Sequence, residues 1–180
     1  MLVNLSDVFS SEGKTVTVTA ELEMTKFASR LGEFLIMKKS PVTLILTNIG
    51  VGKARIEGSA EIVFQTSCDR CLTEVPTTLN LEFLREVASP DTALDNSIEE
   101  GDREADELNF MEGYQLNVET FVYNEILLNW PMKILCRDDC KGICSVCGKN
   151  LNHGECGCDR FVPDPRMAAI KDIFNANKEV

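Results

Sequence analysis

The chain has 180 residues, a net charge of −11 and a sequence pI of about 4.6. This length suffices for one hydrophobic core with a small appendage, and 44% of the residues are apolar, as in ordinary globular domains. No apolar run approaches the ~20 residues that a membrane span requires. The acidic balance also argues against a nucleic-acid-binding surface that covers the whole molecule, because phosphate neutralisation needs Lys and Arg.

The charge is unevenly distributed along the sequence. Residues 86–125 hold twelve acidic residues against Arg103 alone, and the run 89–107 predicts an acidic surface loop. The alternative function of this loop is to mimic nucleic-acid charge and cover a basic face. Residues 26–55, in contrast, hold six basic residues against Glu33, which allows a local basic surface. The candidate RNA contacts there are Lys38, Lys39, Lys53 and Arg55, unless these are ordinary solvated side chains scattered over the surface.

The first half of the chain alternates between apolar and polar residues, as half-buried strands do. Alternation of this kind predicts four strands, at residues 16–24, 42–47, 54–65 and 77–83.

Helical signals follow the strands. Asn117 is suited to cap a helix over residues 118–129, which Pro131 ends. A second helix is predicted to begin at Asp164 as N-cap, with Pro165 at its first position.

These elements predict an α+β fold with two parts. Residues 1–131 are expected to form an antiparallel β-sheet or partial barrel with one packed helix, and residues 132–180 a C-terminal cysteine-rich zinc-binding tail ending in a helix. Trp130 is expected to anchor the core rather than stack on a nucleic-acid base.

The eight cysteines carry the clearest chemical signal, because they fall into four short pairs. A tetrahedral Zn²⁺ takes four thiolates at about 2.3 Å, and a two-residue gap lets one tight turn aim both sulfurs at one ion. The pairs are Cys68 and Cys71, Cys136 and Cys140, Cys144 and Cys147, and Cys156 and Cys158.

Disulfides, a dithiol redox motif and rubredoxin-like iron are the competing interpretations of these cysteines. The start of the chain has neither a basic n-region nor an apolar h-region, which predicts a cytoplasmic protein with reduced thiols. A redox motif would stand at the mouth of a helix in a βαβ unit, whereas Cys68 and Cys71 lie between two predicted strands. We therefore expect one or two structural zinc ions.

The cysteines can be shared between two sites in more than one way. Cys144, Cys147, Cys156 and Cys158 are expected to form one site, which leaves Cys68, Cys71, Cys136 and Cys140 for the other. Exchanging Cys136 and Cys140 with Cys156 and Cys158 fits the spacing almost as well. His153 is a further candidate ligand. A single histidine among thiolates does not make the open coordination site of a zinc hydrolase, so we expect no enzyme and no small-molecule substrate.

Several segments resemble the bacterial YceD family, also called DUF177. They are Ser67 to Leu72, the run Leu116 to Pro131, the stretch Cys136 to Asn152 with its Cys-Lys-Gly-x-Cys-x-x-Cys-Gly pattern, and Asp164 to Lys171. The resemblance implies a non-enzymatic factor for accumulation or maturation of large-subunit (23S) ribosomal RNA. Its partner would be that RNA, a precursor particle or a basic ribosomal protein. The alternatives are a zinc-stabilised protein-interaction module unrelated to ribosomes and a metal-dependent enzyme.

Overall fold

The computed structural model of the chain describes residues 1–94 and 109–158, and these fall into two compact units. The sheet unit comprises residues 1–66 and 74–134, and the cysteine unit comprises residues 67–73 and those from 135 onward. The second unit thus takes residues 67–73, which are the end of one long strand and the turn after it, in addition to the tail. The helix expected from Asp164 and most of the expected acidic loop lie outside the described residues.

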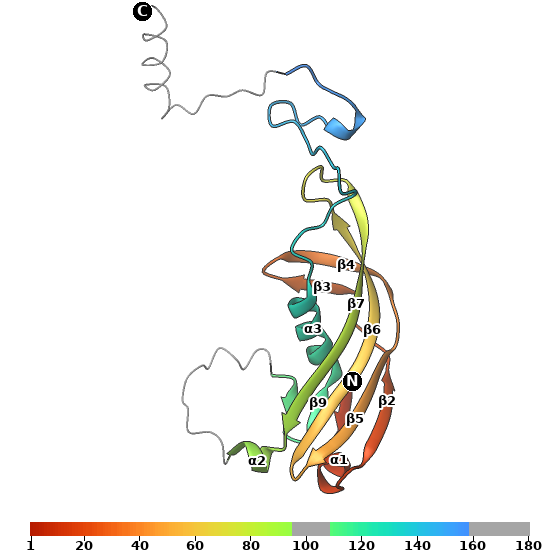
Figure 1. Ribbon diagram of the computed structural model, residues 1–180, viewed down its shortest axis with the longest axis vertical. Helices are drawn as coiled ribbons and strands as arrows, with labels where there is room; N and C mark the ends of the chain where they lie inside the picture. Colours follow the sequence, from red (N-terminus) through yellow and green to blue (C-terminus); the bar gives the residue numbers. More distant parts are fainter. Residues whose placement is uncertain (95–108, 159–180) are drawn as a thin grey trace, which may run out of the picture. The chain divides into compact units, whose positions relative to one another are not determined.

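The sheet unit is built on a six-stranded sheet in the order β2-β5-β6-β4-β3, with β7 also paired to β6 (Figure 1). The pairs β2–β5, β3–β4, β4–β6 and β5–β6 are antiparallel. The strands are β2 (Thr15–Ala20), β3 (Lys26–Ser29), β4 (Gly32–Lys39), β5 (Val42–Gly50), β6 (Lys53–Ser67) and β7 (Glu74–Ala88). The fold therefore confirms the α+β class with an open, mostly antiparallel sheet.

Two long strands of the sheet are each interrupted once. β2 and β3 are the two parts of one, and β4 and β5 are the two parts of the other. β4 and β5 pair in succession with β6, and the amide of Ser40 between them donates to the carbonyl of Glu61 at 2.8 Å. β3 and β2 pair in the same succession with β4 and β5. The sheet is therefore a simple meander of four long strands, in which each strand pairs with its neighbour in sequence.

The strand predicted at residues 16–24 is wrong beyond Ala20, where β2 ends. Glu119 explains the interruption, since its Oε1 accepts hydrogen bonds from the amides of Glu23 at 2.5 Å and Met24 at 3.3 Å. These amides point to a helix side chain instead of a neighbouring strand. The hairpin of β3 and β4 was not anticipated, because four consecutive apolar residues in β4, Phe34 to Met37, hide its alternation.

The helix α3 (Val118–Asn129) begins and ends as the sequence predicts. The Oδ1 of Asn117 accepts from the amide of Thr120 at 3.3 Å, so Asn117 caps the helix. Phe121 is fully buried and lies edge-on to Phe83 of β7, with ring centroids 5.0 Å apart. The helix is therefore held on the sheet by aromatic contacts.

Trp130 follows α3 directly and packs among three aromatic rings of the sheet. Its ring centroid lies 5.3 Å from that of Phe27, 4.5 Å from Phe34 and 5.2 Å from Phe64. Phe27 and Phe64 have no exposed surface. Trp130 is thus engaged in the core of the sheet unit, where it joins the end of α3 to β3, β4 and β6.

An ion pair between a buried carboxylate and a partly exposed guanidinium ties α3 to β7. Glu125 is 2% exposed, and its Oε1 lies 2.9 Å from Nε of Arg85. Burial raises the pKa of Glu125, and the charge and hydrogen bonds of Arg85 oppose that rise. A carboxylate in this position depends on its guanidinium partner, because an unpaired charge in the interior is costly.

Small elements complete the sheet unit, and the sequence did not predict them. β1 (Leu2–Asn4), β9 (Gln115–Asn117) and β8 (Met111–Glu112) form a three-stranded sheet, and α1 (Ser6–Ser10) follows β1. α2 (Pro90–Leu94) is a helical turn where a loop from residue 89 was expected. Among the described residues, none of the helices has the length and apolar character needed to cross a membrane.

Candidate metal centres

The first cysteine pair forms a tight knuckle in the segment between β6 and β7. The amide of Leu72 donates to the carbonyl of Cys68 at 2.9 Å, and the amide of Cys68 donates to the carbonyl of Thr73 at 2.8 Å. Leu72 has a φ of 59°, which is unusual for a residue other than glycine. These bonds turn the chain so that Cys68 and Cys71 belong to one cluster of sulfurs.

The pair Cys144 and Cys147 repeats this knuckle. The amide of Gly148 donates to the carbonyl of Cys144 at 2.9 Å, and the amide of Cys144 donates to the carbonyl of Lys149, also at 2.9 Å. Gly148 has a φ of 71° and occupies the position that Leu72 holds in the first knuckle. The same backbone pattern thus occurs twice. The residue with positive φ is a glycine in the second knuckle but a leucine in the first.

The structure gathers the eight sulfurs into two groups of four. Within each group the four Sγ atoms lie within 4.8 Å of one another. We call them the hairpin quartet (Cys68, Cys71, Cys136 and Cys140) and the tail quartet (Cys144, Cys147, Cys156 and Cys158). The alternative in which Cys136 and Cys140 exchange with Cys156 and Cys158 does not occur. His153 is exposed and belongs to neither group.

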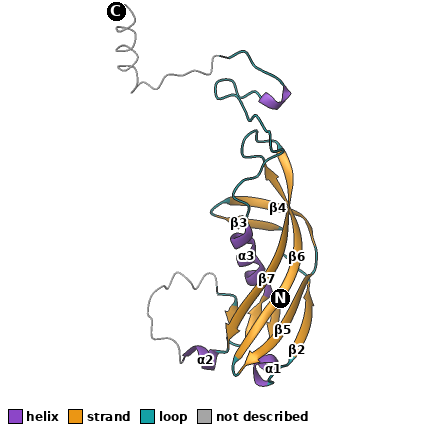
Figure 2. Ribbon diagram, viewed as in Figure 1, coloured by secondary structure: helices purple, strands orange, loops and turns teal. Residues whose placement is uncertain are grey.

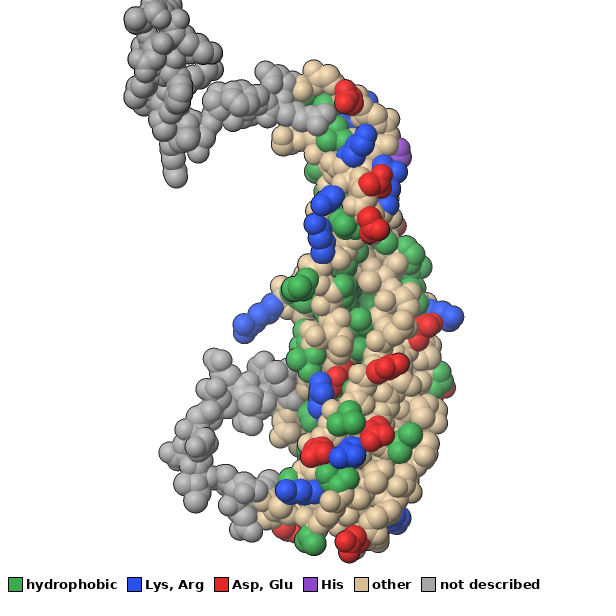
Figure 3. Space-filling model, in the orientation of Figure 1, with side chains coloured by type: hydrophobic (Ala, Val, Ile, Leu, Met, Phe, Trp, Pro, Cys, Tyr) green, Lys and Arg blue, Asp and Glu red, His purple; other side chains and the backbone are tan. Residues whose placement is uncertain are grey.

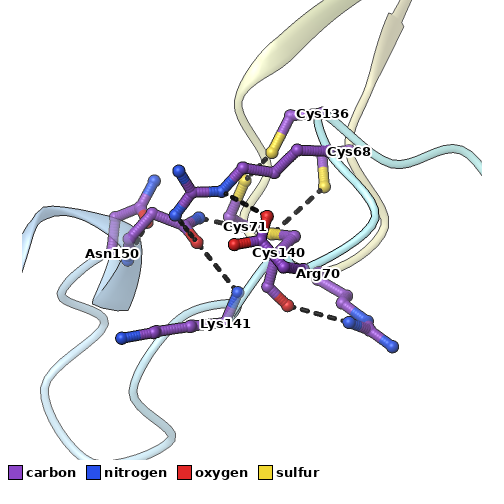
Figure 4. A network of polar contacts seen from close by, with 10 residues as sticks. Cys68, Arg70, Cys71, Cys136, Cys140, Lys141 and Asn150 are labelled. Atoms are coloured by element: carbon purple, nitrogen blue, oxygen red, sulfur yellow. Dashed lines mark hydrogen bonds and ion pairs between the residues drawn. The ribbon is translucent and has the colours of Figure 1, made fainter.

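The spacing of the sulfurs suits a tetrahedral metal ion. A zinc ion with bonds of about 2.3 Å places its sulfurs about 3.8 Å apart along the edges of the tetrahedron. In the hairpin quartet, Sγ of Cys68 lies 3.8 Å from Sγ of Cys140, and Sγ of Cys71 lies 3.5 Å from Sγ of Cys136 (Figure 4). These distances are far longer than the ~2.05 Å of a disulfide, and all eight cysteines are free. Both quartets could therefore hold a metal ion.

The opposed pKa shifts within each quartet also favour the binding of a cation. Burial raises the pKa of Cys68, but backbone hydrogen bonds at Cys136, Arg70 and Cys71 outweigh burial and lower it to about 6. The pKa of Cys136 is raised to about 12, chiefly by its side-chain hydrogen bond to Cys71. One sulfur of the quartet thus ionises readily while another keeps its proton, because four thiolates this close repel one another.

The tail quartet behaves in the same way. Backbone hydrogen bonds at Cys147 and Val146 lower the pKa of Cys144 to about 6, and the side-chain hydrogen bond to Cys147 raises that of Cys158 to about 12. A divalent cation would remove the repulsion in both quartets and let all four sulfurs ionise. Soft thiolate ligands in a closed set of four select zinc over magnesium or calcium.

The segment between the quartets is fixed by Arg70. Its carbonyl accepts from the amide of Ile143 at 3.1 Å, and its Nη1 donates to the carbonyl of Cys140 at 2.8 Å. Gly142 has a φ of 78°, and a Cβ there would lie 3.0 Å from the carbonyl oxygen of Arg70. This close approach explains the glycine in the Cys-Lys-Gly-x-Cys pattern. Apart from η2 (Leu151–His153), the described residues of the cysteine unit form no helix (Figure 2).

The four candidate RNA contacts lie at two separate places on the sheet. Lys38 and Lys39 belong to β4, where Lys38 pairs with Val63, whereas Lys53 and Arg55 stand at the start of β6. Ten positions of β6 separate Lys53 from Val63, which corresponds to roughly 33 Å along a strand. The fold therefore does not bring these four basic residues together.

Two of these residues are also engaged within the sheet unit. Nζ of Lys39 donates to the carbonyl of Met24 at 2.8 Å, and Nη2 of Arg55 lies 3.0 Å from Oε1 of Glu86. On the face seen in Figure 3, acidic and basic side chains of the described residues are interspersed. A continuous basic patch is not visible on that part of the surface.

Comparison with known proteins agrees with the cysteine pattern. The family model described as "Large ribosomal RNA subunit accumulation protein YceD" matches residues 56–174, which include all eight cysteines. The chain belongs to the YceD family. Its match begins within β6 and covers the described part of the cysteine unit.

The curated relatives of this YceD chain add no function. Uncharacterised proteins of Mycobacterium bovis and of two strains of Mycobacterium tuberculosis are each 29% identical to it over 112 residues. The alignment covers 62% of this chain and 51% of each relative, so the chain spans about half the length of the curated relatives it matches. No solved structure matches the chain.

Proposed function

We propose that the chain is a non-enzymatic accessory factor in the synthesis, processing or stability of large-subunit (23S) ribosomal RNA, and that it acts by binding. The observation that carries this proposal is the YceD match over residues 56–174, because the family description names accumulation of the large ribosomal RNA subunit. A ribosome-associated role is what membership of this family suggests. The protein acts in the cytoplasm, where ribosomes are assembled.

Structural zinc is the second part of the proposal. Each quartet offers four thiolates, which is the ligand set of closed structural sites and not of catalytic sites that keep a position open for water. Zinc there holds the cysteine unit in shape and presents its surface to a partner. This ligand chemistry supports a binding role over a metal-dependent enzyme.

Depletion of the protein in its host tests the ribosomal role. We expect 23S ribosomal RNA and large-subunit particles to fall relative to 16S ribosomal RNA, as measured by Northern blotting and sucrose gradients. Wild-type protein should restore the ratio, and protein with all four cysteines of one quartet changed to Ser should not. An unchanged ratio, together with no co-sedimentation with large-subunit precursors, would favour the interaction module unrelated to ribosomes.

The direct partner is either pre-ribosomal RNA or a basic ribosomal protein. The net charge of −11 and the engagement of Arg55 by Glu86 favour the ribosomal protein. RNA contact would instead use Lys38 and Lys39 or Lys53 and Arg55, so each pair is changed to Glu separately. If either double change weakens RNA binding and reduces its salt dependence, RNA is the partner. If neither does, capture of ribosomal proteins is tested with the acidic residues from Asp95 to Glu107 neutralised, which leaves Glu119 and Glu125 of α3 intact.

A further inference from the structure

Asn152 lies between the two halves of the tail quartet in sequence, yet its side chain contacts the hairpin quartet. Its Nδ2 donates to Sγ of Cys140 at 3.3 Å. Its Oδ1 accepts from the amide of Lys141 at 2.8 Å and from Nη2 of Arg137, also at 2.8 Å. The described polar contacts of this amide group thus all go to the segment that carries Cys136 and Cys140.

The position of Asn152 is fixed by the chain that follows the second knuckle. Asn152 sits in η2, where Oδ1 of Asn150 accepts from its amide at 2.9 Å. The next anchor is Leu151, which is buried and whose amide donates to the carbonyl of Gly142 at 2.9 Å. The knuckle itself closes through Cys144 and Lys149, immediately before this segment. Chain folded around the tail quartet therefore holds the Asn152 side chain in place.

A second asparagine of this segment, Asn150, also contacts the surroundings of the hairpin quartet. Nδ2 of Asn150 donates to Oγ1 of Thr73 at 3.3 Å, and this hydroxyl lies 3.2 Å from Sγ of Cys71. Both asparagines after the second knuckle thus contact groups that surround sulfurs of the hairpin quartet.

We propose that the two metal sites bind zinc cooperatively and that Asn152 is the positioning residue that couples them. Metal in the tail quartet orders the segment from Lys149 to Asn152, and the ordered amide group, whose Nδ2 donates to Sγ of Cys140, holds that sulfur in position as a ligand. A hydrogen bond to a metal-bound ligand typically changes metal affinity by about 10- to 100-fold. Because linkage is reciprocal, metal in the hairpin quartet strengthens binding at the tail quartet by the same factor.

This inference rests on the proposed metal binding, and the test separates the two. Co²⁺ is titrated into the full-length protein in place of zinc, and the thiolate-to-cobalt absorption band reports filling of the quartets. Competition with zinc then gives the zinc affinity of each. If the wild-type chain binds no metal, the proposal of zinc sites is refuted. If it fills two sites independently of each other, only the proposed coupling is refuted.

The decisive comparison is a double-mutant cycle on the hairpin quartet. One arm disables the tail quartet by changing Cys144 and Cys147 to Ser, and the other arm is Asn152→Asp. Asp keeps an oxygen for the amide of Lys141 but has no donor for Sγ of Cys140. Each arm should weaken zinc binding at the hairpin quartet about tenfold or more, and the combination should add little to the larger single effect.

Two further variants control for loss of structure. Asn152→Leu removes both kinds of contact at similar volume and should weaken the hairpin quartet at least as much as Asn152→Asp. His153→Ala changes an exposed neighbour in the same turn and should leave both affinities unchanged. Trp130 fluorescence checks that the sheet unit remains folded in each variant. Effects that simply multiply in the cycle, or wild-type affinity in Asn152→Asp, would overturn the coupling.

Discussion

Loss of the hairpin quartet should destabilise the sheet unit more than loss of the tail quartet. The perturbation is Cys68 and Cys71 changed to Ser, compared with Cys156 and Cys158 changed to Ser. A metal in the hairpin quartet joins Cys71 to Cys136 across 65 positions, a stretch that includes all of β7 and all of α3. The tail quartet joins Cys147 to Cys156 across only nine positions, all within the cysteine unit.

The loop lengths give the magnitude. An unfolded chain that is cross-linked over 65 residues loses entropy worth about 4.3 kcal/mol at 25 °C, and one cross-linked over nine residues about 2.6 kcal/mol. The hairpin variant should therefore lose about 1.7 kcal/mol more of its free energy of unfolding than the tail variant. The same ordering holds if metal leaves the unfolded chain, because closing the long loop opposes its rebinding.

Urea unfolding followed by fluorescence of Trp130, which is the only tryptophan, measures this difference. Saturating zinc keeps the remaining quartet filled in each variant, so that coupling between the sites does not enter. A chelator provides the control, since all three proteins should unfold at nearly the same urea concentration without metal. The reasoning is refuted if the tail variant loses as much stability as the hairpin variant in zinc, or more.

Three further outcomes follow from the packing and the knuckles. Trp130→Ala should cost about 3 kcal/mol, the lower end of the range for buried aromatic residues, in urea unfolding followed by circular dichroism, because Trp130 is partly buried and packs among three aromatic rings; a loss below 1 kcal/mol would contradict the core role. Glu125→Gln should change the pH dependence of stability. The raised pKa of Glu125 means that wild type, relative to this variant, is most stable below about pH 4 and loses stability as pH rises through the folded pKa. Parallel curves of unfolding free energy against pH for the two proteins would exclude this. Leu72→Gly should relieve about 1 kcal/mol of backbone strain and tighten zinc binding at the hairpin quartet about fivefold, as measured by chelator competition. Gly148→Ala should weaken zinc binding at the tail quartet in the same assay. Equal effects of the last two changes would show that the positive φ is not what matters.

Local signals were enough to predict α3 and the two cysteine knuckles. Asn117 and Pro131 mark the two ends of α3 because capping and the loss of an amide act within one turn of the chain. The short gaps within each cysteine pair likewise indicate a knuckle without reference to distant residues. The choice between the two ways of sharing the pairs needed the fold, since spacing alone left Cys136 and Cys156 exchangeable.

Other features depended on distant residues and were missed. The end of β2 follows from Glu119, about a hundred positions away, which removes two amides from strand pairing. The contacts of Asn152 with the hairpin quartet have no sequence signal beyond an asparagine in a turn. The grouping of Lys38 with Arg55 was suggested by closeness in sequence, but an extended chain places such residues far apart.

The separation of Cys71 from Cys136 also affects the order in which the protein is made. At synthesis rates of roughly 5–20 residues per second, the first knuckle waits about 3–13 seconds for its partners. The tail quartet is complete within the fourteen positions from Cys144 to Cys158, which takes about 1–3 seconds. The oldest thiols on the nascent chain are therefore the ones exposed longest to oxidants and to stray metal ions. We therefore expect oxidation or mismetallation during synthesis to affect the hairpin quartet before the tail quartet.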